Sequence, residues 1–417
     1  MHHATETYHV EKRFYTKNCI SDFIAQKTLT RIMQISASLK HDVWHGLTES
    51  GSYEWWYFDA LDDEHVYSFV AIWYSGFPFS PYYLQQYFKS QRSRSAFSAN
   101  PLEHVAFSFN LYEHGREIIN FIKEGDSSLF SASRNEPYVR FEHNEFRFDE
   151  TRQTYVLNLH FEMPSRRKKV RATLEFKVRP LQGHKQLSRY SSSTHIHSWV
   201  LASPSNDVSG ELEIYDSRVR RTIHFKGKGY HDHNYGRAPM HTDIKHWYWG
   251  RAHSDDLDLV YYIITYKHTW QEPFSFLLLT QSDRVLTVTN HLKTVEHECS
   301  KGLFLPSYGK RFSLTNSRVT FHIEHLNALD TGPFYLRFNS KFSLLREDGT
   351  SVEMMGISES LHPQNLNSVF VRHLIKSKIW RVGKLSVMYT LYNFFAQLLD
   401  FGTKKIGLVV PEAIGEK

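Results

Sequence analysis

The sequence contains little cysteine, no long apolar run and only a small excess of positive charge. Cys19 and Cys299 are the only cysteines among 417 residues. They cannot form a disulfide framework, and we expect a reducing compartment. No run of about 18 apolar residues occurs, so no transmembrane helix is expected. The first residues lack the apolar core of a secretory signal, so we expect a cytoplasmic protein.

Glycine, proline and net charge are also low, and each excludes a class of protein. With 20 Gly and 13 Pro, the chain is neither collagen-like nor of low complexity. The formal net charge of +6 is too small to indicate a nucleic-acid partner. Residues 372–417 contain eight Lys or Arg and three Asp or Glu. Most of the positive charge therefore lies in the C-terminal tail.

Aromatic residues are abundant instead, with 30 Phe, 24 Tyr and 9 Trp. Hydrophobic residues make up 41% of the chain and charged residues 23%, so the chain can bury a large core and is not disordered. At about 150 residues per domain, the length predicts two or three domains.

Alternating apolar and polar residues predict many short strands. In residues 105–111, Val105, Phe107, Phe109 and Leu111 alternate with small or polar side chains, as in a half-buried strand. Similar alternation or short apolar runs occur in residues 139–148, 155–161, 170–176, 257–266, 274–279, 318–323 and 335–344. This pattern predicts an all-β protein built as barrels or sandwiches.

A weak internal repeat predicts two similar barrels in tandem. Residues 55–63 read WWYFDALDD and residues 247–256 read WYWGRAHSDD. Each begins with an aromatic strand, continues through an acidic turn and is followed by a second hydrophobic strand. We expect an N-terminal extension, two barrels and a basic, amphipathic helical tail. Their predicted bounds are residues 1–43, 44–210, 211–371 and 372–417.

Helical patterns occur only near the two ends. Residues 21–39 can hold one short helix, and residues 385–399 carry no charge and place apolar side chains on one helical stripe. Two interpretations of the C-terminal segment remain open. It packs on the barrels as an ordinary helix, or it lies in a membrane interface. In the second case the basic side chains touching anionic lipid are Lys376, Lys378, Arg381 and Lys384.

The densest polar and aromatic cluster comprises residues 227–236, with residues 194–199 and 246–251 on either side. Side chains two apart on a strand share a face. His197 and Trp199 therefore share one face. On the other strand, one face carries Tyr230, Asp232 and Asn234. The opposite face carries His231 and His233.

Three interpretations of this cluster remain open from spacing alone. Two His-x-His pairs offer imidazoles at a metal-binding spacing, but no Cys or Glu completes a recognised motif. Alternatively, Asp232 in an aromatic pocket is desolvated, so its pKa rises and it can act as an acid near neutrality. In the third interpretation Asp232 is a turn residue and the aromatic rings only fill a barrel.

Glu54 poses the same question, because it shares a strand face with Trp56 and Phe58. A carboxylate among tryptophans is either a pocket group or the partner of a buried Arg. The chain contains no Gly-rich phosphate loop, Ser nucleophile elbow or Cys-x-x-Cys motif.

Three sequence blocks resemble the carotenoid 1,2-hydratase (hydroxyneurosporene synthase) family. Residues 52–60 are similar to its N-terminal signature, residues 229–236 with 247–251 to its central signature, and residues 356–361 to a C-terminal block. The resemblance implies a tandem pair of lipocalin-like β-barrels. It also implies cofactor-independent addition of water to a terminal isoprenoid double bond.

The resemblance further implies roles for a His-x-Trp pair and a Tyr-x-Asp pair. Asp232 would donate the proton, Trp199 and Tyr230 would stabilise the resulting cation, and His197 would position or deprotonate the water. The expected substrate-binding residues are Glu54, Trp56, Asn234, Trp247 and Trp249. No metal and no cofactor are expected, and the expected partner is a hydrophobic carotenoid, isoprenoid or polyene. A pericyclase, isomerase or cyclase and a non-catalytic lipid carrier are the alternatives.

Overall fold

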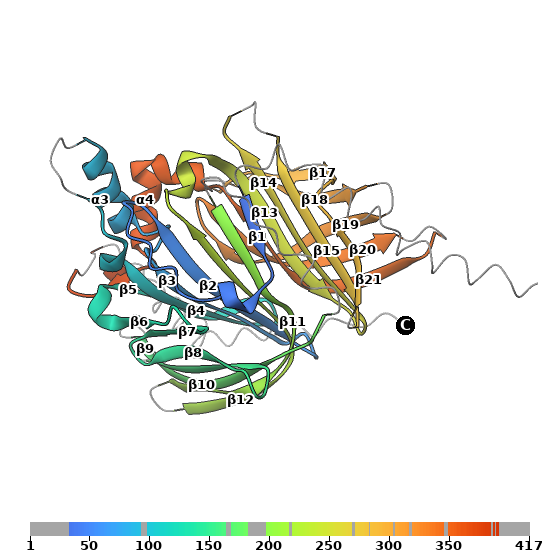
Figure 1. Ribbon diagram of the computed structural model, residues 1–417, viewed down its shortest axis with the longest axis horizontal. Coiled ribbons are helices and arrows are strands. Elements are labelled where there is room, and N and C mark those ends of the chain that lie inside the picture. The colour runs from blue at the N-terminus through green and yellow to red at the C-terminus, as the bar shows by residue number, and fades with distance from the viewer. Residues whose placement is uncertain are drawn as a thin grey trace, which may run out of the picture.

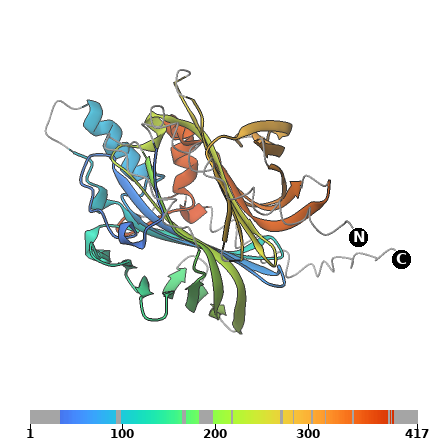
Figure 2. The same ribbon diagram turned by 45° about the vertical axis from the view of Figure 1, so that its right-hand side comes forward.

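The computed structural model describes most of the chain. The described residues are 33–92, 98–163, 168–181, 197–216, 219–268, 272–282, 284–302, 305–316, 319–345, 349–384, 387 and 389–391. They fold into two large, mainly antiparallel sheets that lie side by side, with short helices at one end (Figures 1 and 2).

The first sheet has thirteen strands in the order β22-β5-β4-β3-β2-β12-β11-β10-β9-β8-β7-β6, with β1 pairing with β11. Its strands are β1 (Met33–Ser36), β2 (Tyr53–Asp62), β3 (Tyr67–Ser75), β4 (Val105–Glu113), β5 (Arg116–Gly125), β6 (Phe130–Ala132), β7 (Tyr138–Phe141), β8 (Asn144–Asp149), β9 (Thr154–Met163), β10 (Lys168–Val178), β11 (His197–Asp216), β12 (Val219–Gly236) and β22 (Trp380–Arg381).

The second sheet has nine strands in the order β16-β15-β14-β13-β21-β20-β19-β18-β17. Its strands are β13 (Ile244–His253), β14 (Leu257–Tyr266), β15 (Phe274–Gln281), β16 (Arg284–Thr289), β17 (Lys293–Ser300), β18 (Tyr308–Thr315), β19 (Thr320–Thr331), β20 (Tyr335–Leu345) and β21 (Ser351–Leu361). Both sheets curl into half-barrels (Figures 1 and 2).

The helices are short. α3 (Pro81–Arg92) and α4 (Val369–Lys376) lie side by side at one end of the sheets (Figure 1). Five single 3-10 turns complete the described elements: η2 (Leu39–His41), η3 (Pro101–Glu103), η4 (Ser127–Leu129), η6 (Met240–Thr242) and η7 (Pro363–Asn367). Within the described residues, no helix is long and apolar enough to cross a membrane.

The two sheets repeat one topology. In the first sheet β2 lies between β3 and β12, and in the second β13 lies between β14 and β21. The first strand of each repeat therefore pairs with the last strand of that repeat. The similarity between residues 55–63 and 247–256 follows from this, because they begin the two repeats. The all-β, tandem lipocalin-like fold is confirmed.

Three hydrophobic clusters stabilise this arrangement. One fills the first half-barrel and another fills the second. The third, here called the inter-sheet core, joins residues of β2, β3, β11 and β12 to residues of β13, β14, β15 and β21. All ten residues of β2 are buried, because one face of this strand lines the first half-barrel and the other faces the inter-sheet core.

Two boundaries differ from those the sequence predicts. The predicted division at residues 210 and 211 falls inside β11, and β12 also belongs to the first sheet. The chain passes to the second sheet only after Gly236, because β11 and β12 form a long hairpin of the first sheet, which the predicted boundary divides. Part of the predicted extension, Met33–Ser36, is strand β1 of the first sheet.

The terminal helices are only partly as predicted. Within residues 21–39 the described part forms β1 and the start of η2, and residues 21–32 lie outside the described residues. The predicted helix over residues 385–399 is helical at residues 387 and 389–391 and lies otherwise outside them. Helix α4 begins at Val369, three residues before the predicted helical tail of residues 372–417, and its Ile375 packs into the inter-sheet core.

Candidate active site

Asp232 lies near the end of β12, on the face that meets the inter-sheet core. Its Oδ2 accepts hydrogen bonds from Trp199 Nε1 and from the Tyr230 hydroxyl, both at 2.7 Å. Its Oδ1 accepts one from Asn234 Nδ2 at 2.8 Å. β11 and β12 pair so that Trp199 lies opposite Asn234, which brings the His-x-Trp and Tyr-x-Asp pairs together as the alternation predicts.

Asp232 is only 4% exposed, and this burial has the largest effect on the pKa of its carboxyl. Desolvation raises the pKa of this carboxyl to about 7, against the opposing effect of the Tyr230 and Trp199 hydrogen bonds. The negative charge of Glu359 adds to the rise. Asp232 is therefore poised to hold or release a proton near neutral pH.

A small cavity opens beside Asp232, between the two sheets. It is lined by Trp55, Tyr57, Asp232, Asn234, Trp247, Trp249, Tyr262 and Glu359. Its volume is about 30 Å³, which is room for about one or two water molecules. A larger substrate therefore enters only if the aromatic side chains move apart.

His197 is held behind this cavity by two tyrosines. The Tyr53 hydroxyl lies 2.8 Å from Nδ1 and the Tyr262 hydroxyl 3.2 Å from Nε2. Burial lowers the pKa of His197 to about 3, so the ring is neutral at pH 7. One ring nitrogen then donates to a tyrosine oxygen and the other accepts from a tyrosine hydroxyl.

Glu359, on β21, is a second carboxyl at the cavity. Its Oε1 accepts hydrogen bonds from the Tyr335 hydroxyl at 2.6 Å and from Arg337 Nε at 3.1 Å. Burial raises the pKa of Glu359, while the Arg337 guanidinium opposes that rise. Arg337 is itself buried and donates to the Tyr112 hydroxyl of the first sheet at 3.0 Å.

Glu54 and Trp56 do not lie where the sequence placed them. Both are on the opposite face of β2 from the cavity, and Trp56 belongs to the core of the first half-barrel. The cavity is lined from β2 by Trp55 and Tyr57 instead. The sequence could not settle this choice, because β2 is buried on both faces and its alternation does not identify the inner one.

Glu54 belongs to a buried polar cluster inside the first half-barrel. Its Oε1 accepts from His45 Nδ1 at 2.7 Å and from His233 Nε2 at 2.9 Å. Asp42 Oδ2 accepts from His231 Nε2 at 2.9 Å, and Asp42 Oδ1 lies 3.3 Å from His233 Nδ1. Burial disfavours the charged form of His233, but the carboxylates of Asp42 and Glu54 favour it. Together they raise the pKa of His233 to about 9.

This cluster is also the place where the described residues could hold a metal ion. One ligand atom each from His45, Glu54 and His233 lies within 4.8 Å of the others. The distances of 2.7 and 2.9 Å to Glu54 are those of hydrogen bonds. Both histidines are therefore placed to hydrogen-bond to Glu54.

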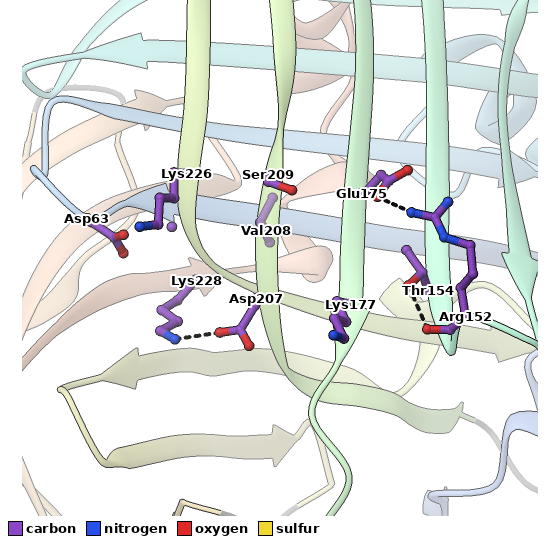
Figure 3. A pocket seen from close by; sticks show the side chains of 11 residues that line it. Asp63, Arg152, Thr154, Glu175, Lys177, Asp207, Val208, Ser209, Lys226 and Lys228 are labelled. Carbon is purple, nitrogen blue, oxygen red and sulfur yellow. Dashed lines mark hydrogen bonds and ion pairs between the residues drawn. The ribbon is translucent and has the colours of Figure 1, made fainter.

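A larger hollow lies on the surface of the first sheet and is unlike the Asp232 cavity (Figure 3). Its volume is about 460 Å³. Two ion pairs lie in its lining, Arg152 with Glu175 and Lys228 with Asp207, each at 2.5 Å. Such a lining is exposed and charged, so it does not fit an apolar ligand.

Sequence reasoning missed four residues around the site. Trp55 and Tyr57 belong to the other parity of β2, and Tyr262 lies in a strand that was predicted without a role. Glu359 lies in the C-terminal block of residues 356–361, which was recognised as a signature but given no chemistry. No spacing rule connects Glu359 to Asp232, because the two residues meet only through the packing of the sheets.

The fold and site together define an all-β, tandem lipocalin-like protein with two carboxyls in an aromatic cavity. A family model described as "Carotenoid hydratase CrtC" matches residues 71–387. The chain belongs to this carotenoid hydratase family, and it is an enzyme with a hydratase-like function.

Two relatives carry names that differ on the reaction, one a dehydrogenase and the other a hydratase. The chain is 41% identical over 371 residues to a "Hydroxyneurosporene dehydrogenase" from Chlorobaculum tepidum, covering 87% of this chain and 96% of the relative. It is 26% identical over 339 residues to an "Acyclic carotenoid 1,2-hydratase" from Thiocapsa roseopersicina, covering 80% of this chain and 74% of the relative.

Solved structures support the fold. CghA superposes with a TM-score of 0.54 at 12% identity, covering 79% of this chain and 96% of that chain. An AttH structure from Nitrosomonas europaea superposes with a TM-score of 0.51 at 14% identity, covering 74% and 92%. At these identities the likeness concerns the fold alone.

Proposed function

We propose that the protein adds water to a terminal double bond of a carotenoid or related isoprenoid, with Asp232 as the proton donor. The observation that carries this proposal is the buried Asp232 carboxyl, held by Trp199 and Tyr230 at an aromatic cavity. Membership of the carotenoid hydratase family supports the substrate class.

The proposed reaction begins with transfer of the Asp232 proton to the less substituted alkene carbon. A tertiary carbocation forms at the other carbon, and the faces of Trp249 and Tyr57 can stabilise it by cation–π attraction. These rings are inclined at 67° to one another, in an edge-to-face arrangement, with centroids 5.2 Å apart. Water then adds to the cation, and each step is a proton transfer or an addition that requires no redox cofactor.

His197 is a positioning residue in this proposal. Its low pKa makes it a weak base at neutral pH, and its two ring nitrogens are engaged by Tyr53 and Tyr262. It therefore fixes Tyr262, which lines the cavity, and does not itself take the proton from water.

The test is to supply the purified protein with acyclic carotenoids, shorter isoprenoids and polyenes, and to weigh the products. A mass gain of one water supports hydration. A loss of two hydrogens would support the dehydrogenase name carried by the Chlorobaculum relative. An unchanged mass with a new retention time would indicate isomerase or pericyclase chemistry, and a bound, unaltered lipid would indicate a carrier.

Asp232→Asn is the decisive variant. It keeps the shape of the side chain but cannot donate an acidic proton, so hydration should fall by about 10² to 10⁴-fold. Asp207→Asn is the matched control, because Asp207 is exposed and pairs with Lys228 at the surface. Full activity of a folded Asp232→Asn protein would exclude Asp232 as the donor.

We also propose that the end of the molecule carrying α4 contacts an anionic membrane. Residues 363–384 contain five Lys or Arg and no Asp or Glu. Arg381 is buried and pairs with Glu124, and Lys378 pairs with Asp330, so these two do not face lipid as the sequence predicted. Arg372, Lys376 and Lys384 are partly or fully exposed and supply the positive charge of the surface.

On α4, Ile375 packs inward, whereas Val369 and Phe370 are 59% and 57% exposed. A basic, partly apolar surface binds anionic membranes. Such a contact would let an apolar substrate pass from the membrane to the protein.

Vesicle sedimentation tests the membrane contact. Binding to vesicles containing phosphatidylserine should weaken with salt and fall sharply in a Phe370→Ser, Lys376→Glu variant. Absence of binding at low salt would exclude this surface as a membrane contact. The same charge reversal at exposed Lys310, on the second sheet, is the control.

A further inference from the structure

We propose that Glu359 is the base that accepts the proton from the attacking water. This inference rests on the proposed hydration and adds a second catalytic residue to it. Glu359 and Asp232 are the two carboxyl side chains that line the cavity, and the two sheets contribute one each. The acid is on β12 of the first sheet and the base on β21 of the second.

The cavity that both carboxyls line has room for water. Its volume of about 30 Å³ admits about one or two water molecules. In the proposed reaction, a water bound there lies next to the carboxyls that line the cavity. An alkene carbon that takes a proton from Asp232 is therefore close to a water that Glu359 can hold.

The hydrogen bonds of Glu359 leave one oxygen for that water. Tyr335 and Arg337 both donate to Oε1. Among the described residues, none makes a hydrogen bond to Oε2. Glu359 is 8% exposed although it is surrounded by the packed sheets, which is consistent with Oε2 facing the cavity.

The register of the second sheet fixes this orientation. Glu359 lies directly opposite Trp249 on β13 and opposite Arg337 on β20. Arg337 in turn reaches the Tyr112 hydroxyl on β4. On one side, Glu359 is held by the buried guanidinium of Arg337, which contacts both sheets. On the other side lies Trp249, which lines the cavity.

No other group around the cavity suits the role as well. His197 does not line the cavity, and both of its ring nitrogens are engaged. Burial raises the pKa values of Tyr57 and Tyr262 well above the usual range, so neither phenol is an effective base at neutral pH. Arg337 beside Glu359 favours its ionised form, against the effect of burial, and a carboxylate can accept a proton.

The two carboxyls then exchange one proton through the reaction. Asp232 transfers its proton to the alkene and becomes a carboxylate. The water oxygen forms the new C–O bond, and its proton passes to Glu359 Oε2. Return of that proton to Asp232, through water in the cavity, restores the starting state. The sum is one alkene and one water converted to one alcohol, with no oxidant or reductant.

The electrostatics agree with this division of roles. Burial raises the pKa of both groups, and the charge of Glu359 contributes to the rise at Asp232. The Arg337 guanidinium favours the ionised form of Glu359. Two neighbouring buried carboxyls share one proton more readily than they hold two or none, and Arg337 beside Glu359 favours its location on Asp232.

Glu359→Gln in deuterated water separates the two steps. The variant retains Asp232, so the cation still forms, but no base accepts the proton of water. The cation then returns a proton to Asp232, and the alkene is recovered deuterated or with a shifted double bond. We expect hydration to fall at least about 100-fold while deuterium exchange stays within about tenfold of the parent protein.

The matched control is Glu353→Gln on the same strand, where the carboxylate is exposed and pairs with Lys341. Hydration by Glu359→Gln within about threefold of the parent protein would overturn the proposal. Joint loss of hydration and exchange in a folded variant would also overturn it, because Glu359 would then act before water addition.

If Glu359→Gln does not fold, Glu359→Asp takes its place under the same criteria. It keeps the charge beside Arg337 and withdraws the carboxyl from the cavity by one methylene. Failure of the proposed hydration itself is distinguishable, because the parent protein would then give no product with the mass of one added water from any substrate.

Discussion

The indole N–H of Trp199 donates to Oδ2 of Asp232 at 2.7 Å, from β11 to the neighbouring strand β12. This bond and that of Tyr230 favour the charged carboxylate, whereas burial favours the neutral acid. Burial is the larger effect, so the pKa of Asp232 is raised to about 7. The two hydrogen bonds limit that rise. An acid of that strength donates its proton readily and can be reprotonated at neutral pH.

The rate of hydration should therefore depend on pH in a defined direction. Asp232 must be protonated to act as the donor, so kcat/KM should decrease as the pH rises through about 7. Glu359 must be ionised, so kcat/KM should also decrease at low pH, from a pKa above the usual glutamate range. A pH profile of kcat/KM measures both limbs. A rate that stays constant from pH 6 to 9 would contradict the role of Asp232.

Replacing Trp199 should move the alkaline limb. Trp199→Phe retains a ring but removes a donor to the charged form of Asp232, so the Asp232 pKa rises further. A hydrogen bond to a charged group contributes about 1.5–3 kcal/mol, which corresponds to a shift of about one pH unit or more. The limb of kcat/KM should move to higher pH by that amount.

Trp56→Phe is the control for this experiment. Trp56 is equally buried, but it lies on the other face of β2, in the core of the first half-barrel. Its substitution should leave the pH dependence unchanged. An unchanged alkaline limb in Trp199→Phe itself would show that this bond does not govern the acid.

Stability should be greatest in mildly acidic solution because of the buried cluster around His233. The His233 pKa is raised from 6.5 to about 9, so its contribution is fully present below pH 6.5 and is lost as the pH rises through 9. The Asp42 and Glu54 pKa values are lowered from 3.8 and 4.5. Their contribution is present above those values and is lost as the pH falls below them.

Urea unfolding between pH 3 and pH 10 measures this dependence. His233→Gln should lower stability at pH 6 and flatten the decrease between pH 7 and pH 9, since the titrating ring is gone. An alkaline decrease of the same slope in this variant would assign the effect to other groups. His224→Gln, at an exposed position earlier on β12, serves as the control.

A buried ion pair joins the two sheets and should be costly to break. Arg251 on β13 pairs with Asp59 on β2, with Nε 2.5 Å from Oδ1, and both side chains are buried. Arg251→Met leaves Asp59 buried without its partner, so the free energy of unfolding should fall by about 3–5 kcal/mol.

Arg152→Met is the matched control for Arg251→Met. Arg152 pairs with Glu175 at 2.5 Å, but the two side chains are 52% and 35% exposed. Loss of such a surface pair should lower the free energy of unfolding by less than about 1 kcal/mol. Denaturant unfolding measures both changes. If the two variants lose the same free energy of unfolding, the buried position of the Arg251–Asp59 pair does not make its loss more costly.

Much of the fold can be read from local patterns. On β10, Val170, Ala172, Leu174 and Phe176 are buried and alternate with more exposed residues, because one face of that strand meets a core and the other meets water. Alternation does not identify the inner face of β2, because both of its faces are buried. Alternation also does not encode which strands pair, so the predicted domain boundary fell inside β11 and assigned β12 to the wrong repeat.

Local sequence patterns were enough to predict the strand content, the tandem repeat and the pairs His197 with Trp199 and Tyr230 with Asp232. Each depends on neighbours one or two residues apart, where strand geometry fixes the direction of side chains. Tertiary packing alone places the cavity between the sheets, lines it with Trp55 and Tyr57, and brings Glu359 to the same cavity as Asp232. Those relationships join residues far apart in the chain, and they arise from the burial of two aromatic sheet faces against each other.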